Sequence, residues 1–369
     1  MGKFKLLMLI CLFFTIIAVA QTYSGGSGTA TDPYLISSKA DMETLANAVN
    51  ANYMYSRDKY FLLTQDITDA VTTVIGNTVG TDNFRPFKGT FDGGGFKINV
   101  NINITISDQS SLSIGVFGNL EGATIKNLGV VGSITISFSS YNTFYYAGGI
   151  CGNAQSNTKI ANCYNISNIS CSNNYNRSYT GGICGYAFSY TTIANCFNIG
   201  NITNHSLYCY CGGICGESAS GDIKECFNIG TIESQGYCGG ICGSAQNDIV
   251  KSFNTGTIIS LNNNNMTVNH SGGICGYSYS SITNCYNTGN IINYWASSTG
   301  GICGETGYGP NANCYNIGNI ISYSYGDLIF QYGTGTGGIG EGESKNCFAA
   351  NHTIKSNIMN QNGSLFAKE

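Results

Sequence analysis

The sequence predicts an all-β protein, a parallel and right-handed β-helix of about ten coils with a small N-terminal α/β cap. Three observations lead to this fold class: a tetrapeptide that recurs six times, a second signature after each copy, and a composition poor in charged residues. Charged residues make up only 10% of the chain, against roughly 25% in ordinary globular proteins. Because 42% of the residues are hydrophobic, general disorder is excluded, and regular stacking is the expected way to bury them.

The recurring tetrapeptide is Gly-Gly-Ile-Cys, and its residues form the predicted core of the stack. Its isoleucines and cysteines are Ile150, Ile183, Ile214, Ile241, Ile274 and Ile302, followed by Cys151, Cys184, Cys215, Cys242, Cys275 and Cys303. A unit of about 30 residues cannot bury an apolar face alone, whereas stacked units share one continuous interior. We therefore expect each position to form a column along the solenoid. The glycine pair is expected at a corner, with positive φ or a close approach of two backbones.

Two other architectures compete with the solenoid. A propeller needs about four strands per blade and therefore longer repeats than these. A set of separate small domains is the second alternative. The regular spacing of the signatures favours a single stack over both.

A second signature, Asn-Cys-aromatic-Asn in most copies, follows the tetrapeptide, as at residues 195–198. Its last Asn is expected to bond neighbouring backbone, and stacked copies would then form a ladder. The direction of its cysteine stays open. Ile193 and Phe197 share strand parity, which would turn Cys196 outward, whereas a corner near Asn195 would turn it inward.

The chain is expected to divide into four parts. Residues 1–20 carry two lysines, an apolar run and the pattern Ala18-Val19-Ala20, which is typical of a secretory signal peptide. Residues 21–88 are predicted to form a cap of strand, helix and strand, because the open end of a solenoid must be covered. Residues 89–348 hold the repeats, and residues 349–369 form a C-terminal tail or cap. We expect a secreted or cell-surface protein without membrane insertion after signal cleavage.

The cap helix is expected after Ser37 and Ser38, which are good N-cap residues. Its apolar face repeats at helical spacing and comprises Met42, Leu45, Ala46 and Val49. Strands are expected on either side of it, at residues 33–36 and 60–63.

The repeats resemble the GLUG repeat family of bacterial secreted and surface proteins. The resemblance lies in Gly-Gly-Ile-Cys-Gly at residues 181–185 and in the stretch 195–198, and it extends roughly over residues 25–348. Such repeats occur in adhesin-like proteins and in non-catalytic parts of some immunoglobulin A metallopeptidases. The resemblance implies a β-helix with a surface role and implies no chemistry. One departure is cysteine in place of the second aliphatic residue of the repeat core.

Of the 17 cysteines, Cys11 lies in the predicted signal peptide and 16 follow it. Three interpretations stay open: buried thiols that fill the core, disulfides between neighbouring coils, or metal ligands. The candidate disulfide joins Cys211 and Cys238, because each directly precedes a Gly-Gly pair and the two share a column in adjacent coils. No metal site and no cofactor is predicted.

Binding is the expected activity, because tyrosine recurs beside Asn and Ser outside the signatures. The candidate ligand contacts are Tyr186, Tyr277, Tyr294 and Trp295, since exposed aromatic residues anchor sugars or proteins at low entropic cost. Alternatively, these tyrosines only cover the strands. The expected partner is a protein or glycan on a host or neighbouring cell. Nucleic acid is not expected, because the net charge is −4 and basic clusters are missing from the sequence.

Two functions of other classes remain open beside the adhesin-like display rod or binding surface. A carbohydrate-active lyase or hydrolase on the same fold would need several carboxylates that converge on one flank of neighbouring coils. The sequence assigns no catalytic residue, and acidic residues are few across residues 150–340: Glu217, Asp222, Glu225, Glu233, Asp248, Glu305 and Asp327. A structural spacer that works with a separate catalytic protein would need no site at all.

Overall fold

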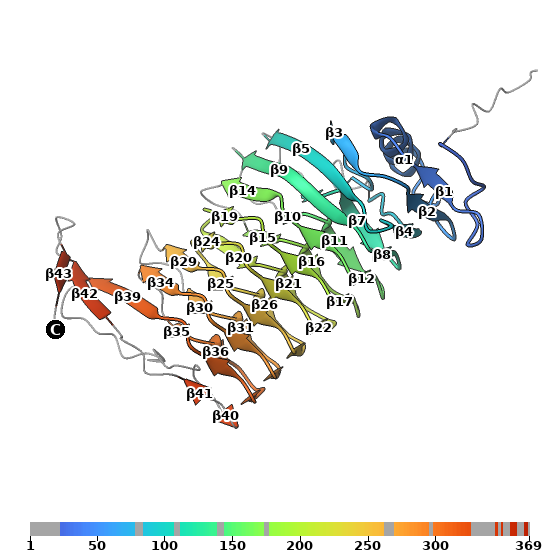
Figure 1. The fold of residues 1–369 in the computed structure, drawn as a ribbon. Coiled ribbons are helices and arrows are strands. Elements are labelled where there is room, and N and C mark those ends of the chain that lie inside the picture. Colours follow the sequence, from blue (N-terminus) through green and yellow to red (C-terminus); the bar gives the residue numbers. More distant parts are fainter. Residues whose placement is uncertain are drawn as a thin grey trace, which may run out of the picture.

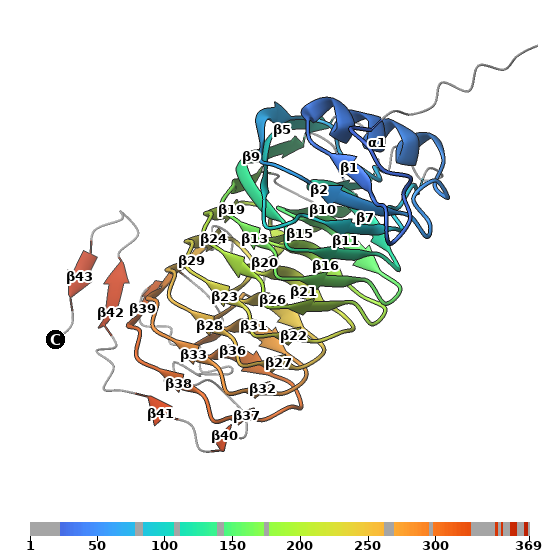
Figure 2. The ribbon, with the colours of Figure 1, turned by 45° about the vertical axis from the view of Figure 1, so that its right-hand side comes forward.

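The computed structural model describes residues 23–77, 84–106, 111–138, 144–172, 177–261, 269–294, 298–325, 344–345, 348–349, 355–359 and 365–367. The predicted signal peptide and Trp295 lie outside these ranges. The described chain winds into a parallel β-solenoid that starts at helix α1 (Lys39–Ala51) and advances coil by coil toward the C-terminus (Figures 1 and 2).

Each turn visits four sheets in a constant order, here numbered 1 to 4. Sheet 1 contains β6 (Leu112–Ile114), β10 (Phe144–Gly148), β15 (Arg177–Gly181), β20 (Tyr208–Gly212), β25 (Tyr237–Gly239), β30 (His270–Gly272) and β35 (Ser298–Gly300). Sheet 2 contains β7 (Phe117–Glu121), β11 (Cys151–Gln155), β16 (Cys184–Ala187), β21 (Cys215–Ser218), β26 (Cys242–Ala245), β31 (Cys275–Ser278) and β36 (Cys303–Thr306). The Gly-Gly-Ile-Cys signature therefore spans the corner between sheets 1 and 2.

Sheet 3 follows and has one strand from almost every coil. It contains β1 (Tyr34–Ile36), β2 (Tyr60–Leu63), β4 (Thr90–Asp92), β8 (Thr124–Lys126), β12 (Lys159–Ala161), β17 (Thr192–Ala194), β22 (Ile223–Lys224), β27 (Ile249–Val250), β32 (Ile282–Thr283), β37 (Asn311–Ala312) and β40 (Ser344–Lys345). The second signature lies at the corner between this sheet and sheet 4.

Sheet 4 begins with long strands and continues with two short strands per coil. It contains β3 (Ile67–Val71), β5 (Lys97–Ile106), β9 (Gly129–Phe138), β13 (Tyr164–Asn165), β14 (Asn168–Ser172), β18 (Phe197–Asn198), β19 (Ile202–Asn204), β23 (Phe227–Asn228), β24 (Ile232–Ser234), β28 (Phe253–Asn254), β29 (Ile258–Leu261), β33 (Tyr286–Asn287), β34 (Ile291–Tyr294), β38 (Tyr315–Asn316), β39 (Ile320–Tyr325), β41 (Phe348–Ala349), β42 (Lys355–Met359) and β43 (Leu365–Ala367). The described strand pairs are parallel except β42 with β43.

The solenoid and its repeat unit are as predicted, but the number of coils is lower. Among the described residues, sheets 1 and 2 contain seven strands each, so about seven turns visit all four sheets. The prediction of about ten coils also counted the segment of β4, which follows the cap strand β2. These strands extend sheet 3 without adding a described strand to sheets 1 and 2.

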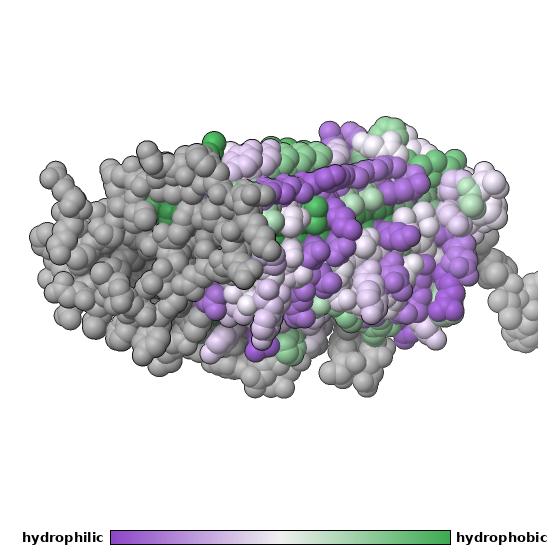
Figure 3. Space-filling view, turned by 90° about the horizontal axis from the view of Figure 1, so that it is seen from below, coloured by the Kyte–Doolittle hydropathy of each residue, from purple (hydrophilic) through white to green (hydrophobic). Residues whose placement is uncertain are grey.

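The repeated residues stand over one another in columns. The isoleucines of the tetrapeptide form a single file, because the backbone N–H of each, from Ile150 to Ile274, donates to the carbonyl of the next at 2.9–3.1 Å. The cysteines that follow them pair in register from Cys151 to Cys303, and both columns are fully buried. Figure 3 shows the outside of the same regularity, with hydrophilic residues in rows along the long axis.

The glycine pair is needed for close backbone approach and not for positive φ. Positive φ is found at other positions of the repeat, and the described Gly-Gly pairs of the tetrapeptide do not have it. A Cβ on Gly181 would clash with the Cys184 carbonyl oxygen, and one on Gly182 would meet the Asn198 side chain at 2.5 Å. Only glycine therefore lets the chain turn this corner against the coil beside it.

The second signature contains the left-handed corner instead. The residue before its cysteine has a φ of 53–56°, for example 54° at Asn195, and Lys251, before Ser252 in the copy without the cysteine, has a φ of 49°. Asn tolerates this conformation better than most residues. The corner turns Cys196 into the core, fully buried, and leaves Phe197 half-buried on the outside. The inward alternative for the cysteine is therefore the one that the fold adopts.

The N-terminal elements lie at one end of the stack (Figure 1). The Ser38 hydroxyl accepts from the Asp41 N–H at 3.2 Å and caps α1. The predicted apolar face of the helix is buried, namely Met42, Leu45, Ala46 and Val49.

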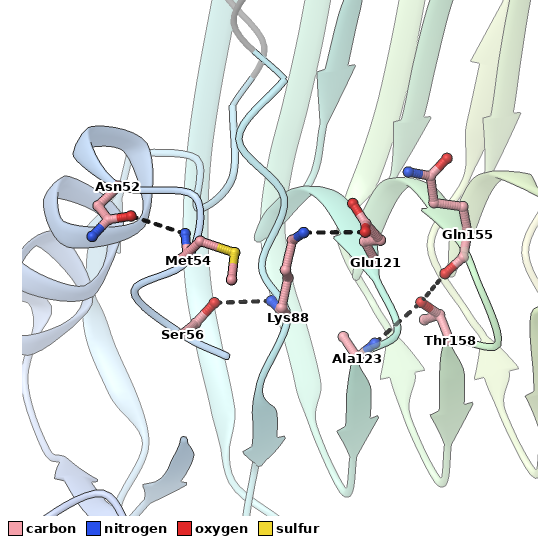
Figure 4. Close-up of polar contacts among 8 residues, drawn as sticks. All are labelled: Asn52, Met54, Ser56, Lys88, Glu121, Ala123, Gln155 and Thr158. Carbon is pink, nitrogen blue, oxygen red and sulfur yellow. Dashed lines mark hydrogen bonds and ion pairs between the residues drawn. The ribbon is translucent and has the colours of Figure 1, made fainter. Parts of the chain in front are cut away.

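Polar contacts join the turn after α1 to the first coils (Figure 4). The Lys88 N–H donates to Ser56 Oγ at 2.9 Å, and Lys88 Nζ lies 3.1 Å from Glu121 Oε1. One coil further, Thr158 Oγ1 donates to the Gln155 carbonyl at 2.6 Å and accepts from the Ala123 N–H at 3.3 Å. In the described ranges no helix has both the length and the apolar character that a membrane span requires.

Candidate functional site

Sheets 1 and 2 carry a surface that we call the tyrosine face. In sheet 1, one column contains Tyr146, Tyr179, Tyr210, Tyr237 and His270. In sheet 2, the facing column contains Tyr186, Glu217, Ser244, Tyr277 and Glu305. Most of these side chains are half-buried and lie between inward-facing neighbours. Each column has five residues, and because the sheet 2 column is shifted by one coil the face extends over six successive coils.

The tyrosines of sheet 1 are stacked on one another. The ring centroids of Tyr146 and Tyr179 are 5.2 Å apart, those of Tyr179 and Tyr210 are 5.0 Å apart, and those of Tyr210 and Tyr237 are 4.9 Å apart. The ring planes are within 18° of parallel. Each ring therefore covers the face of the next, so the column presents ring edges and phenol groups outward and not ring faces.

The two columns are in contact across the corner between the sheets. The ring of Tyr186 lies 5.4 Å from that of Tyr146 and 5.1 Å from that of Tyr179. Glycine makes this contact feasible, because a Cβ on Gly185 would lie 2.6 Å from the Ala147 nitrogen. A larger residue there would separate the sheets and the two columns.

Glu217 is the carboxylate at the centre of the tyrosine face. It pairs in register with Tyr186 on one side and with Ser244 on the other. Gln246 Nε2 donates to its Oε1 at 3.4 Å. Burial raises the pKa of Glu217 to about 7, and the guanidinium of Arg177 offsets only part of this effect. The carboxyl group is therefore close to half-ionised at neutral pH.

The face ends at His270 and Glu305. Nδ1 of His270 lies 3.2 Å from Glu305 Oε2. Burial lowers the pKa of His270 to about 4, so the imidazole is neutral at pH 7. Tyr277 packs against it, with ring centroids 5.5 Å apart.

The carboxylates of the face are not arranged as a glycosidase pair. Glu217 and Glu305 are three coils apart in one column, which corresponds to about 14 Å at about 4.8 Å per coil. Paired catalytic carboxylates are about 5–9.5 Å apart. Glu233 lies in sheet 4, where its Oε1 is 2.6 Å from Nε2 of His205. Across the described ranges no three His, Cys, Asp or Glu residues are grouped so that they could hold a metal ion.

The structure places two of the four predicted contact residues in one column, three coils apart. Tyr186 and Tyr277 share the sheet 2 column, whereas Tyr294 lies in β34 of sheet 4 and is half-buried there. Trp295 is outside the described residues.

The stacked tyrosines of sheet 1 were missed by sequence reasoning. They do have a signal, because each of the four stands two residues before a Gly-Gly pair. The position of Glu217 among them follows only from the register of the sheets.

The described cysteines are buried and carry free thiols. Cys211 and Cys238 are register partners in β20 and β25, as expected for the candidate disulfide, but the two thiols are not bonded in this structure. Burial raises the pKa of both thiols well above the usual range. A disulfide between them stays a prediction.

A second stack runs along sheet 4 and is formed by the second signature. Tyr164, Phe197, Phe227, Phe253, Tyr286 and Tyr315 stack at 4.8–5.0 Å with ring planes within 7° of parallel. Beneath them the buried asparagines form the predicted ladder, because the amide of each donates to Oδ1 of the next at 2.7–2.8 Å from Asn165 to Asn316. This stack lacks a carboxylate like Glu217, so it serves as an internal comparison for the tyrosine face.

Comparison with known proteins matches the repeats and the fold. The family model of the GLUG motif matches residues 176–203 and 267–292. Halomucin of Haloquadratum walsbyi is 35% identical over 119 residues, and a "Putative Gly-rich membrane protein" of Evansella cellulosilytica is 29% identical over 136 residues. These matches cover 29% and 33% of this chain but only 1% and 15% of the two relatives.

A solved structure of similar fold is a "putative immunoglobulin A1 protease" from Bacteroides ovatus. It aligns with a TM-score of 0.50 over 94% of this chain and 82% of its own, at 18% identity. At this identity the likeness concerns the fold alone. The chain therefore carries GLUG motifs within a parallel β-solenoid, as the resemblance of its repeats implied.

Proposed function

We propose that the chain is an exported, non-catalytic repeat protein that displays a ligand-binding surface outside the cell, in the manner of an adhesin. The observation that carries this proposal is the tyrosine face. Its side chains are held in register by two sheets over six coils, and tyrosine offers a large contact area and a polar group at low entropic cost.

The rigidity of the stack supports a role in binding. Each tyrosine is fixed by backbone pairing on both sides and by the ring of its neighbour, as for Tyr210 between Tyr179 and Tyr237. A partner would therefore meet a surface that loses little conformational freedom on binding.

Export is supported by the signal-peptide pattern at residues 1–20 and by the names of the relatives, a mucin-like name and a membrane protein. The proposed partner is a protein or glycan on a neighbouring or host cell. The low charge of the chain gives no electrostatic basis for nucleic acid.

Arrays of glycans and of surface proteins, probed with the purified chain, would test the proposal. Tyr210→Phe removes one phenol group but preserves the stack, and Tyr286→Phe makes the same change in the stack of sheet 4. We expect saturable binding that Tyr210→Phe weakens and Tyr286→Phe leaves unchanged. Equal effects of the two variants would contradict binding at the tyrosine face.

The purified chain can also be used to distinguish the two alternative functions, a carbohydrate-active enzyme and a structural spacer. Release of oligosaccharides from a polysaccharide would favour a carbohydrate-active enzyme. A chain that binds nothing on either array would favour a structural spacer.

A further inference from the structure

Within the part of the chain that the structure describes, Glu217 forms no ion pair. The described lysines that form ion pairs are engaged with other carboxylates, and the histidines near carboxylates lie beside Glu233 and Glu305. Arg177 acts on Glu217 without forming an ion pair with it. A half-buried carboxylate without a close counter-ion is costly to ionise.

Tyrosine phenol groups lie close enough to the carboxylate of Glu217 to be affected by its charge. Gln246 donates to Oε1, which leaves Oε2 for a further donor. Tyr186 precedes Glu217 in its column, and the stacked tyrosines of sheet 1 lie across the corner. Phenol groups both donate and accept hydrogen bonds, so they can donate to a carboxylate or accept from an ammonium group bound beside it.

We propose that the tyrosine face binds one ammonium group at Glu217, the side chain of a lysine on an exposed segment of a partner protein. This inference rests on the proposed function, because it names the chemistry that the face would recognise. The ammonium would donate to Glu217 Oε2 and to neighbouring phenol oxygens, while the aliphatic part of the lysine would pack along the ring edges.

Lysine suits the site better than arginine. A guanidinium binds a carboxylate best through two parallel hydrogen bonds, one to each oxygen. Gln246 donates to Oε1 of Glu217 at 3.4 Å, so a bidentate guanidinium would have to share that oxygen with Gln246. A compact ammonium with three rotatable donors can bind through Oε2 alone.

The distribution of charge favours a protein partner over a polymer of amino sugars. Such a polymer carries a positive charge on successive units and would need carboxylates at matching intervals. The neighbours of Glu217 in its column, Tyr186 and Ser244, are neutral. The next carboxylate, Glu305, is three coils away beside His270. One isolated negative charge matches one lysine within an uncharged segment.

The state of Glu217 makes the binding depend on pH. The groups around it that titrate or carry charge are Tyr146, Arg177, Tyr179, Tyr186, Tyr210, Tyr237 and Cys242. Burial raises the pKa of each of these five tyrosines, so they stay neutral near pH 7, and Glu217, with a pKa of about 7, is the group that changes. The lysine should therefore bind more tightly at pH 8 than at pH 6.

The test is calorimetric titration of the full chain with the peptide acetyl-Gly-Lys-Gly-amide at pH 8 and pH 6. The comparison ligands are the same peptide with acetylated lysine, the arginine peptide and a glucosamine oligomer. We expect Glu217→Gln to weaken lysine binding at least about tenfold, since hydrogen bonds to charged groups contribute about 1.5–3 kcal/mol. The control Glu233→Gln, on sheet 4, should bind as the unaltered chain does.

Several outcomes would overturn the proposal. These are unchanged binding by a folded Glu217→Gln variant, equal binding of the acetylated peptide, or tighter binding of the arginine peptide or the glucosamine oligomer. Glu217→Gln should fold, because it replaces a costly buried charge by a neutral isostere, and circular dichroism would verify this. If the arrays identify a partner that Glu217→Gln still binds, this inference fails and the proposed function stands. If the lysine peptide binds but the arrays identify no partner, the proposed function fails alone.

Discussion

The buried asparagine ladder allows a quantitative test of the way in which the coils hold together. Asn228 lies in its middle and is fully buried. Its amide donates to Oδ1 of Asn254 at 2.8 Å and to the Gly230 carbonyl at 2.8 Å, and its Oδ1 accepts from Asn198 at 2.8 Å. Replacement by alanine removes all three hydrogen bonds and leaves buried partner atoms without their usual bond.

The expected loss follows from these contacts. A hydrogen bond contributes about 0.5–1.5 kcal/mol net, and an unsatisfied buried partner costs more. Asn228→Ala should therefore lower the free energy of unfolding by about 2–4 kcal/mol. The matched control is Asn201→Ala, because exposed Asn201 also bridges two coils but accepts only one backbone bond, from Thr231 at 3.0 Å. The control should cost about 0.5–1 kcal/mol.

Urea unfolding followed by far-UV circular dichroism would measure the two variants. Because stacked repeats can unfold in parts, amide hydrogen exchange should be measured as well, to show which coils each variant destabilises. We expect faster exchange in the coils of Asn198, Asn228 and Asn254 and unchanged exchange near α1. A loss below about 1 kcal/mol, or equal losses for Asn228→Ala and Asn201→Ala, would refute the view that the ladder is a main source of cohesion between coils.

Three further predictions concern Glu217, the thiols and the glycine corner. The pKa of Glu217 is raised from 4.5 to about 7 in the folded chain, so the folded state is most stable relative to the unfolded state below pH 4.5 and loses stability as the pH rises toward 7. The free energy of unfolding of Glu217→Gln should therefore exceed that of the unaltered chain by about 2–3 kcal/mol at pH 8 and by almost nothing at pH 4. Urea unfolding at both pH values would measure the difference. The fifteen described cysteines are buried, and burial raises the pKa of Cys211 and Cys238, so a thiol reagent should modify the folded chain only as fast as it unfolds, and rapid labelling would contradict this burial. Gly185→Ala should lower the free energy of unfolding by about 2–4 kcal/mol, because its Cβ would meet backbone atoms at 2.6 Å. Gly95→Ala should lower it by about 1–2 kcal/mol, because a Cβ there has no atom within 4 Å but the backbone has a φ of +86°. Thermal unfolding of the two variants would distinguish crowding from backbone strain.

Much of the fold could be predicted because the same residue types recur at the same position of each repeat. The six copies of Gly-Gly-Ile-Cys implied columns of isoleucine and cysteine, and both columns are present and buried. The asparagine ladder followed from the second signature for the same reason. The number of coils was overestimated, since strand-like segments near the N-terminus do not reveal which sheets they join.

The sequence by itself therefore determined the stacking, the repeat unit and the residues that share a column, because these depend on period alone. The tertiary structure alone decided which way each column faces and which columns meet. Cys196 points inward because Asn195 adopts a left-handed φ of 54°, and strand parity does not continue through such a corner. Tyr179 meets Tyr186, and Glu217 lies among tyrosines, because glycines allow sheets 1 and 2 to approach closely. Contacts between different columns depend on the angle of each corner, and that angle is set by packing across the whole coil.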